Sequence, residues 1–173
     1  MTDAARAGDV PSVGFEANGG FLLASDINHD GRTLAALPTR DSVLPMLCAL
    51  VAARARGNDL GALVNTLPQR FTLSDRLVDM PTAQSQARLA QLAKNPAGGT
   101  AELGFTEACG PLAAVDETDG LRMTFDKGEV IHLRPSGNAP ELRVYVEAAS
   151  PQRAAELLQT GMDAISTWRH APQ

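Results

Sequence analysis

The chain has 173 residues, of which 44% are hydrophobic and 20% are charged, so it is neither disordered nor fibrous and holds one ordinary domain or two small ones. Its formal net charge of −5 argues against general nucleic-acid binding, which needs clustered positive charge to neutralise phosphates. Because the sequence shows no run of about 18 apolar residues and no secretory signal pattern, we expect a cytoplasmic protein without a membrane span.

The first part of the chain begins with two predicted strands. Short apolar runs at 11–15 and 21–25 flank the polar, glycine-rich segment 16–20, a pattern typical of two strands around a loop. The segment 26–31 faintly resembles the start of a calcium loop, but Leu37 stands where an EF-hand has its closing acid. We therefore interpret this segment as a capped, solvated loop and expect no metal site.

Two helices are predicted next. The first is capped by Asp41 or Ser42 and ends before Gly57, a residue type suited to the position after a helix. Its apolar stripe is predicted to comprise Leu44, Leu47, Cys48 and Val51. The second helix is short and runs from Asp59, as cap, to Leu67, where Pro68 stops it.

Residues 1–68 look truncated. Two strands and two helices form a poor closed core, and their sheet has edges that nothing covers. We interpret this part as the end of a larger α/β domain. An uncovered edge also allows two chains to associate with each other.

The second part, from residue 69, predicts a self-sufficient α+β layer. Alternating apolar residues indicate strands, and Ser150 followed by Pro151 marks the start of the last helix. The predicted order is strand 71–78, helix 81–94, loop 95–111, strands 112–118, 120–126, 129–134 and 141–148, and a final helix from 150. Helices then pack on one face of a largely antiparallel sheet.

The segment RPSGNAPELR joins the last two predicted strands and is the strongest candidate site. Two strands that flank a tight loop bring Arg134 and Arg143 to the same end of the sheet. Between them, Ser136 offers a hydroxyl, Asn138 offers an amide, and Gly137 lets backbone N–H groups approach a ligand. Guanidinium forks combined with short neutral donors suit a phosphate dianion, so the segment predicts phosphate binding by these five residues.

This segment also has a purely structural interpretation. A Pro/Gly-rich hairpin loop would look similar, with Arg143 in a surface salt bridge to Glu141 or Glu147. The spacing alone leaves both interpretations open.

A second candidate site is the glycine-rich loop GFEANGG near the start of the chain. Glu16 and Asn18 are placed to hydrogen-bond vicinal sugar hydroxyls, because a carboxylate accepts hydrogen bonds and an amide both donates and accepts them. The alternative for this loop is an Asn-Gly turn within a hairpin.

The histidines and cysteines form no recognisable catalytic motif. His132 and His170 have no Ser or Cys partner at a readable spacing, which argues against a His-based triad. Cys48 and Cys109 lie far apart and outside any CxxC motif, which favours free thiols over a disulfide.

Both candidate loops resemble parts of one family. RPSGNAPELRVYVEA is similar to the C-terminal phosphate-binding loop and following strand of the α-D-phosphohexomutase superfamily, and GFEANGGFLL resembles the sugar-binding loop of its third domain. The bacterial phosphomannomutase branch is the most similar. The resemblance implies that residues 1–68 are the C-terminal part of domain 3. It also implies that residues 69–173 are domain 4, a four-stranded, mainly antiparallel sheet with helices on one face.

The resemblance further implies a reaction. Members of the family interconvert hexose 6-phosphate and hexose 1-phosphate through a phosphoserine and a bisphosphorylated sugar, with Mg²⁺ stabilising the transferring phosphoryl group. The phosphoserine and metal motifs belong to the first two domains of the family and are absent from this sequence. The chain is therefore expected to bind hexose phosphate, to be inactive alone, and to leave Mg²⁺ to the N-terminal domains.

Site residues carry over one by one from the resemblance. The family's phosphate-binding residues correspond to Arg134, Ser136, Gly137 and Asn138, with Arg143 near them. Its two sugar-binding residues correspond to Glu16 and Asn18. Many members have Thr in place of Asn138 and Ser in place of Asn18, so mannose, glucose and glucosamine remain alternatives. Another hypothesis is a stand-alone phosphosugar-binding module without catalysis.

Overall fold

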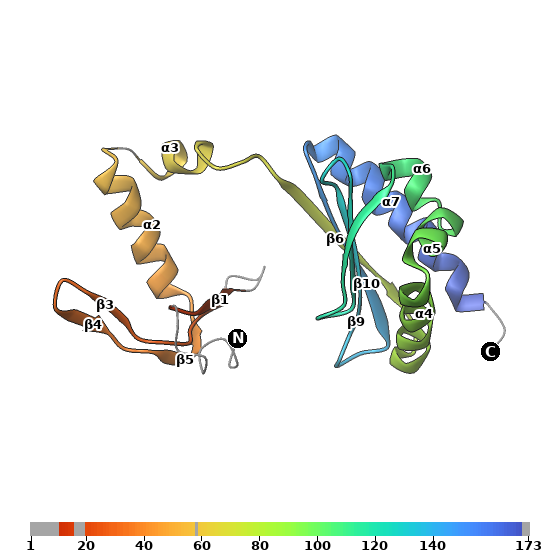
Figure 1. Cartoon of the computed structure of the whole chain (residues 1–173), viewed down its shortest axis with the longest axis horizontal. Helices are drawn as coiled ribbons and strands as arrows, with labels where there is room; N and C mark the ends of the chain where they lie inside the picture. The colour runs from red at the N-terminus through yellow and green to blue at the C-terminus, as the bar shows by residue number, and fades with distance from the viewer. Residues whose placement is uncertain (1–10, 16–19, 58, 171–173) are drawn as a thin grey trace. The chain divides into compact units, whose positions relative to one another are not determined.

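The structure is a computed structural model that describes residues 11–15, 20–57 and 59–170 (Figure 1). The chain divides into two compact units between Pro68 and Gln69, which we call unit 1 and unit 2. Within the described residues, no helix is both long and apolar enough to cross a membrane.

Unit 1 contains a small antiparallel sheet and a separate hairpin. The sheet has the strand order β1-β2-β5, with β1 at Val13–Phe15, β2 at Phe21–Leu23 and β5 at Leu37–Asp41. The predicted pair of strands around the glycine-rich loop is therefore confirmed, and Val13 lies opposite Leu23. The hairpin consists of β3 at Ile27–His29 and β4 at Arg32–Leu34.

The segment 26–31 was predicted to be a capped loop, and that prediction is wrong. It forms the first strand and the turn of the β3–β4 hairpin. Asp30 and Gly31 at the turn both have positive φ values, 48° and 72°, which match the right-handed twist of a two-residue hairpin. The Asp-Gly pair was the local signal for this turn.

Helix α2 spans Val43–Ala55 and helix α3 spans Leu60–Asn65. The Asp41 carboxylate accepts a hydrogen bond from the Val43 N–H at 2.8 Å, whereas Ser42 makes no side-chain capping bond. The predicted apolar stripe of the first helix is not buried, because Leu47, Cys48 and Val51 are exposed. The described part of unit 1 is too small to cover this face of α2.

Unit 2 is an α+β layer, as the sequence predicted. Its antiparallel sheet has the order β6-β10-β9-β8-β7. The strands are β6 (Phe71–Val78), β7 (Leu112–Asp116), β8 (Leu121–Phe125), β9 (Val130–Pro135) and β10 (Glu141–Ala148). The sheet therefore has five strands instead of the four that the family resemblance implied.

The helices of unit 2 lie on one side of this sheet (Figure 1). They are α4 (Thr82–Lys94), α5 (Pro96–Glu102), α6 (Phe105–Cys109) and α7 (Pro151–Ser166), followed by a 3₁₀ turn at Thr167–His170. The predicted loop 95–111 is thus wrong, since it contains α5 and α6. Asn95 caps α5 by accepting a hydrogen bond from the Gly98 N–H at 3.2 Å, and the positive φ of Gly104 separates the two helices.

The alternation predicted along the strands separates a buried face from a polar face. The buried face carries Leu121, Met123, Phe125, Leu142, Val144 and Val146, each at most 1% exposed. Helix α7 packs closely there, because a Cβ atom at Gly161 would lie 2.8 Å from the Val144 Cγ1 atom. The opposite face carries the polar members of the same strands, which are partly exposed.

Candidate functional site

The loop between β9 and β10 holds the predicted phosphate-binding residues. Arg134 lies near the end of β9, Arg143 lies near the start of β10, and the two are directly opposite each other in the strand pairing. Opposed residues of antiparallel strands point to the same face of the sheet. The structure therefore brings both guanidinium groups to one end of the polar face.

The loop is held in place by hydrogen bonds at both of its ends. The Ser136 N–H donates to the Glu141 carbonyl at 2.8 Å, which closes the loop at its base. The Met80 N–H donates to the Pro140 carbonyl at 2.9 Å, and the Thr82 hydroxyl donates to the Ser136 carbonyl at 3.1 Å. The segment after β6 thus fixes a loop that is more than 50 residues away in sequence.

The three residues at the tip of the loop differ in burial. Ser136 is 6% exposed, and its hydroxyl accepts a long hydrogen bond of 3.4 Å from the Asn138 N–H. Gly137 and Asn138 are exposed. A Cβ atom added to Gly137 would meet nothing within 4 Å, and its φ is not positive, so neither packing nor backbone conformation requires glycine there. The missing side chain leaves the backbone of the loop accessible.

A turn between β7 and β8 contacts Arg134 from the side. The Asp119 Oδ2 atom lies 2.7 Å from the Arg134 Nε atom, and this carboxylate raises the pKa of Arg134 above its ordinary value. The turn approaches closely because residue 120 is Gly, with a φ of 91° and only 2.4 Å between an added Cβ and the Leu133 carbonyl oxygen. The sequence interpretation did not include Asp119, although the Asp-Gly pair signals a turn.

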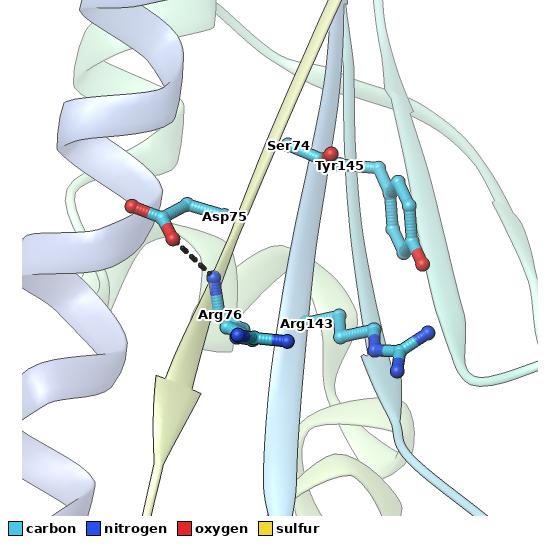
Figure 2. A pocket seen from close by; sticks show the side chains of 5 residues that line it. All are labelled: Ser74, Asp75, Arg76, Arg143 and Tyr145. Atoms are coloured by element: carbon cyan, nitrogen blue, oxygen red, sulfur yellow. Dashed lines mark hydrogen bonds between the residues drawn. The ribbon is translucent and has the colours of Figure 1, made fainter.

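A further arginine, Arg76 of β6, lies directly opposite Arg143 on the other side. The Glu141 carboxylate lies between them, 3.5 Å from a guanidinium nitrogen of each. An open pocket of about 490 Å³ occupies this part of the sheet, and Figure 2 shows its lining: Ser74, Asp75, Arg76, Arg143 and Tyr145. Sequence reasoning missed Arg76, because no local motif connects β6 with the loop.

Tyr145 lies beside both loop arginines. Its hydroxyl is the main cause that raises the pKa of Arg143 above its ordinary value, and it also contributes to the raised pKa of Arg134. Its ring contacts the His132 ring at a centroid distance of 5.6 Å. The His132 Nε2 atom lies 2.6 Å from the Asp119 carbonyl oxygen, so this histidine supports the turn.

The predicted sugar-binding pair, Glu16 and Asn18, lies outside the described residues. It falls between β1 and β2 of unit 1, and its geometry stays a prediction. Among the described residues there is no group of three or more His, Cys, Asp or Glu side chains that could hold a metal ion.

Comparisons with known proteins agree with the fold. The model of the phosphoglucomutase/phosphomannomutase C-terminal domain matches residues 77–164. Phosphomannomutases of Sinorhizobium fredii and Salmonella muenchen are each 41% identical to the chain, which is covered to 96% and 90% respectively. The chain spans 35% and 32% of those two proteins, about a third of their length.

A solved structure supports the fold. A phosphoglucomutase/phosphomannomutase family protein from Burkholderia thailandensis superposes with a TM-score of 0.60 at 17% sequence identity, covering 99% of this chain and 31% of that one. The matched family model covers half of the chain and most of unit 2. This chain therefore belongs to the phosphoglucomutase/phosphomannomutase family, and the matched residues correspond to the C-terminal domain of that family.

Proposed function

We propose that this chain is the substrate-binding C-terminal portion of a phosphomannomutase-type enzyme that interconverts hexose 6-phosphate and hexose 1-phosphate. In this proposal residues 1–68 are the end of domain 3 and residues 69–173 are domain 4. The loop between β9 and β10 binds the phosphate group that does not react. Glu16 and Asn18 contact the sugar.

The observation that carries the proposal is the opposed pair of arginines beside an accessible loop backbone. Arg134 and Arg143 are opposite each other, and Gly137 has no packing or conformational reason to be glycine. Two guanidinium groups, a hydroxyl and open N–H groups form the donor set that a phosphate dianion requires. A phosphate held far from the reacting hydroxyl supplies binding energy that positions that hydroxyl.

The remaining parts of the reaction are assigned to the rest of the enzyme. We propose that the phosphoserine and the Mg²⁺ ion belong to N-terminal domains that this sequence does not contain, and that the enzyme works in the cytoplasm. The 173-residue chain alone is then expected to show no turnover with a hexose 1-phosphate, the bisphosphate activator and Mg²⁺. Turnover of about 1 per second or faster would contradict this assignment.

A stand-alone phosphosugar-binding module is the second candidate. One observation favours it: every described contact that fixes the loop, from Met80, Thr82 and Glu141, comes from unit 2 itself. In this candidate, the loop would bind phosphate without the N-terminal domains. The two candidates differ in whether an enzyme with restored N-terminal domains interconverts the two hexose phosphates.

The phosphate assignment is tested by titrating the chain with inorganic phosphate and with hexose phosphates. Arg134→Ala should weaken binding about tenfold to a hundredfold, and Arg134→Lys should recover part of it, because an ammonium group cannot donate to two oxygens as a fork does. Asn138→Ala should cost about 1 kcal/mol. Arg122→Ala is the matched control, because Arg122 lies on the same face but pairs with Glu147 at 3.1 Å. Unchanged binding by Arg134→Ala would refute the assignment.

A further inference from the structure

We propose that Arg76, Arg143 and Tyr145 form a second anion subsite on the polar face of the sheet. This subsite lies beside the phosphate loop, so that unit 2 binds a diphosphate, free or as an ester, better than a single phosphate. The proposal rests on the proposed function in one respect, because Arg143 is shared between the loop and the second subsite.

The arginines form a row across three neighbouring strands. Arg76 of β6 is opposite Arg143 of β10, which is opposite Arg134 of β9. Neighbouring strands are about 4.8 Å apart, so the row is about 10 Å long. Like charges placed directly opposite each other destabilise a sheet. A bound anion would therefore reduce the electrostatic repulsion among these three adjacent guanidinium groups.

The carboxylates near the row do not satisfy these groups. Glu141 lies 3.5 Å from both Arg76 and Arg143, which is longer than the roughly 2.7–2.9 Å of a strong charge-assisted hydrogen bond. The buried Glu141 Oε2 atom accepts no hydrogen bond of good geometry from the part of the chain that the structure describes. Asp119 contacts only the far end of the row, at Arg134. A guanidinium group has five N–H donors, so Arg76 and Arg143 keep donors beyond those that face Glu141 and Tyr145.

The shape of the surface agrees with this charge pattern. The pocket of about 490 Å³ lies over β6 and β10, and its volume is in the range of about 300–1,000 Å³ that small-molecule sites occupy. Figure 2 shows the Tyr145 ring beside Arg143, with its hydroxyl on the same side as the guanidinium group. Ser74 is opposite Tyr145 in the strand pairing and adds a second hydroxyl. Two cations and two neutral hydroxyl groups therefore line the pocket, together with one carboxylate, Asp75, which Figure 2 shows directed away from Arg143.

The experiment compares inorganic phosphate with pyrophosphate on the 173-residue chain, by isothermal titration at constant ionic strength. Pyrophosphate should bind about tenfold more tightly than phosphate, since it reaches both subsites. Arg76→Gln should weaken pyrophosphate binding about five- to tenfold and phosphate binding less than about twofold. The effect is smaller than that of a buried contact because the Arg76 side chain is 59% exposed. Arg76→Lys should recover part of the loss.

Two further variants complete the test. Arg122→Gln removes the same charge from the same face away from the pocket and should change either affinity less than about twofold. Arg134→Gln should weaken both ligands, which tests the phosphate loop separately. A loss of pyrophosphate affinity below about twofold in Arg76→Gln overturns the second subsite, and so does an equal loss in Arg122→Gln. An unaltered phosphate affinity in Arg134→Gln would instead overturn the loop assignment alone.

Discussion

Arg153 of α7 connects three elements of unit 2, and its removal should destabilise that unit. Its Nε and Nη2 atoms lie 2.7 and 3.0 Å from the two carboxylate oxygens of Glu129, just before β9. The Nη2 atom also donates to the carbonyl of Ala108 in α6 at 2.6 Å. Only 11% of the Glu129 side chain is exposed, and the Arg153 guanidinium group is its main partner, with smaller contributions from Cys109 and Lys127.

The expected magnitude follows from these contacts. Arg153→Met keeps the apolar stem but leaves the Glu129 carboxylate buried without its cation. Breaking a fully buried ion pair costs about 3–5 kcal/mol, and a charge-assisted hydrogen bond contributes about 1.5–3 kcal/mol. Because 30% of the Arg153 side chain is exposed, we expect about 3 kcal/mol near pH 7. Glu129→Gln should cost less, about 1–2 kcal/mol, because it leaves no buried charge.

The difference between Arg153→Met and the unmodified chain should depend on pH. The hydrogen bond from Arg153 is the largest cause that lowers the pKa of Glu129 below its ordinary value of 4.5. A group whose pKa is depressed by folding contributes stability above its unfolded pKa and loses it as the pH falls through its folded pKa. The difference in unfolding free energy should therefore be full at neutral pH and shrink once the pH is well below 4.5.

The assay is urea unfolding followed by the fluorescence of Trp168, the single tryptophan of the sequence, which is 8% exposed in the core of unit 2. Arg122→Met is the matched control, because it breaks a pair with Glu147 whose side chains are 37% and 32% exposed and should cost less than about 1 kcal/mol. Equal losses in the two variants, or a loss in Arg153→Met that does not change with pH, would refute the reasoning.

Three further predictions concern other parts of the chain. Burial raises the pKa of Cys109 to about 12, whereas Cys48 is exposed. A thiol reagent at pH 8 should therefore modify Cys48 in the folded chain and Cys109 only after unfolding. Mass spectrometry would detect the second adduct, and its appearance before unfolding would contradict the prediction. Gly161→Ala should destabilise unit 2 by about 1–3 kcal/mol in urea, because the new Cβ would meet Val144 and this cost outweighs the gain of about 1 kcal/mol in helix propensity. Hydrogen exchange should be faster before residue 69 than after it, given the exposed apolar face of α2, and uniform protection would contradict this.

Local signals explain which parts of the fold were predictable. The predicted strands 120–126 and 129–134 are confirmed as β8 and β9, and the turn between them contains Gly128, which has a φ of 77° and whose N–H donates to the Phe125 carbonyl at 2.7 Å. The segment 95–111 was mispredicted because its Asn, Pro and Gly residues were interpreted as breakers. Asn95 caps α5, and Gly104 and Gly110 cap α6, whereas Pro96, Gly98 and Gly99 lie inside α5. Helices of seven and five residues are too short to show a hydrophobic period.

In the candidate site, too, only the residues that lie close together in sequence were predictable. Arg134 and Arg143 flank one short loop, so the sequence alone predicts that they meet. Arg76 and Asp119 come from elements that are distant in sequence, and only the pairing of strands places them beside the loop. The apolar stripe of α2 shows the opposite case. Its helical period predicted the helix correctly, but the stripe is exposed because the described residues include no element that covers it.

The strand order of unit 2 has a consequence for how the protein is made. β6 is the first strand of the unit to leave the ribosome, yet its sheet neighbour is β10, the last. β6 must therefore wait as an unpaired strand until almost the whole unit has been synthesised, and such a waiting strand is exposed to aggregation. The contacts from Met80 and Thr82 that hold the loop between β9 and β10 form only at that final step. A nascent chain therefore acquires the proposed anion site only when β6 and β10 have paired.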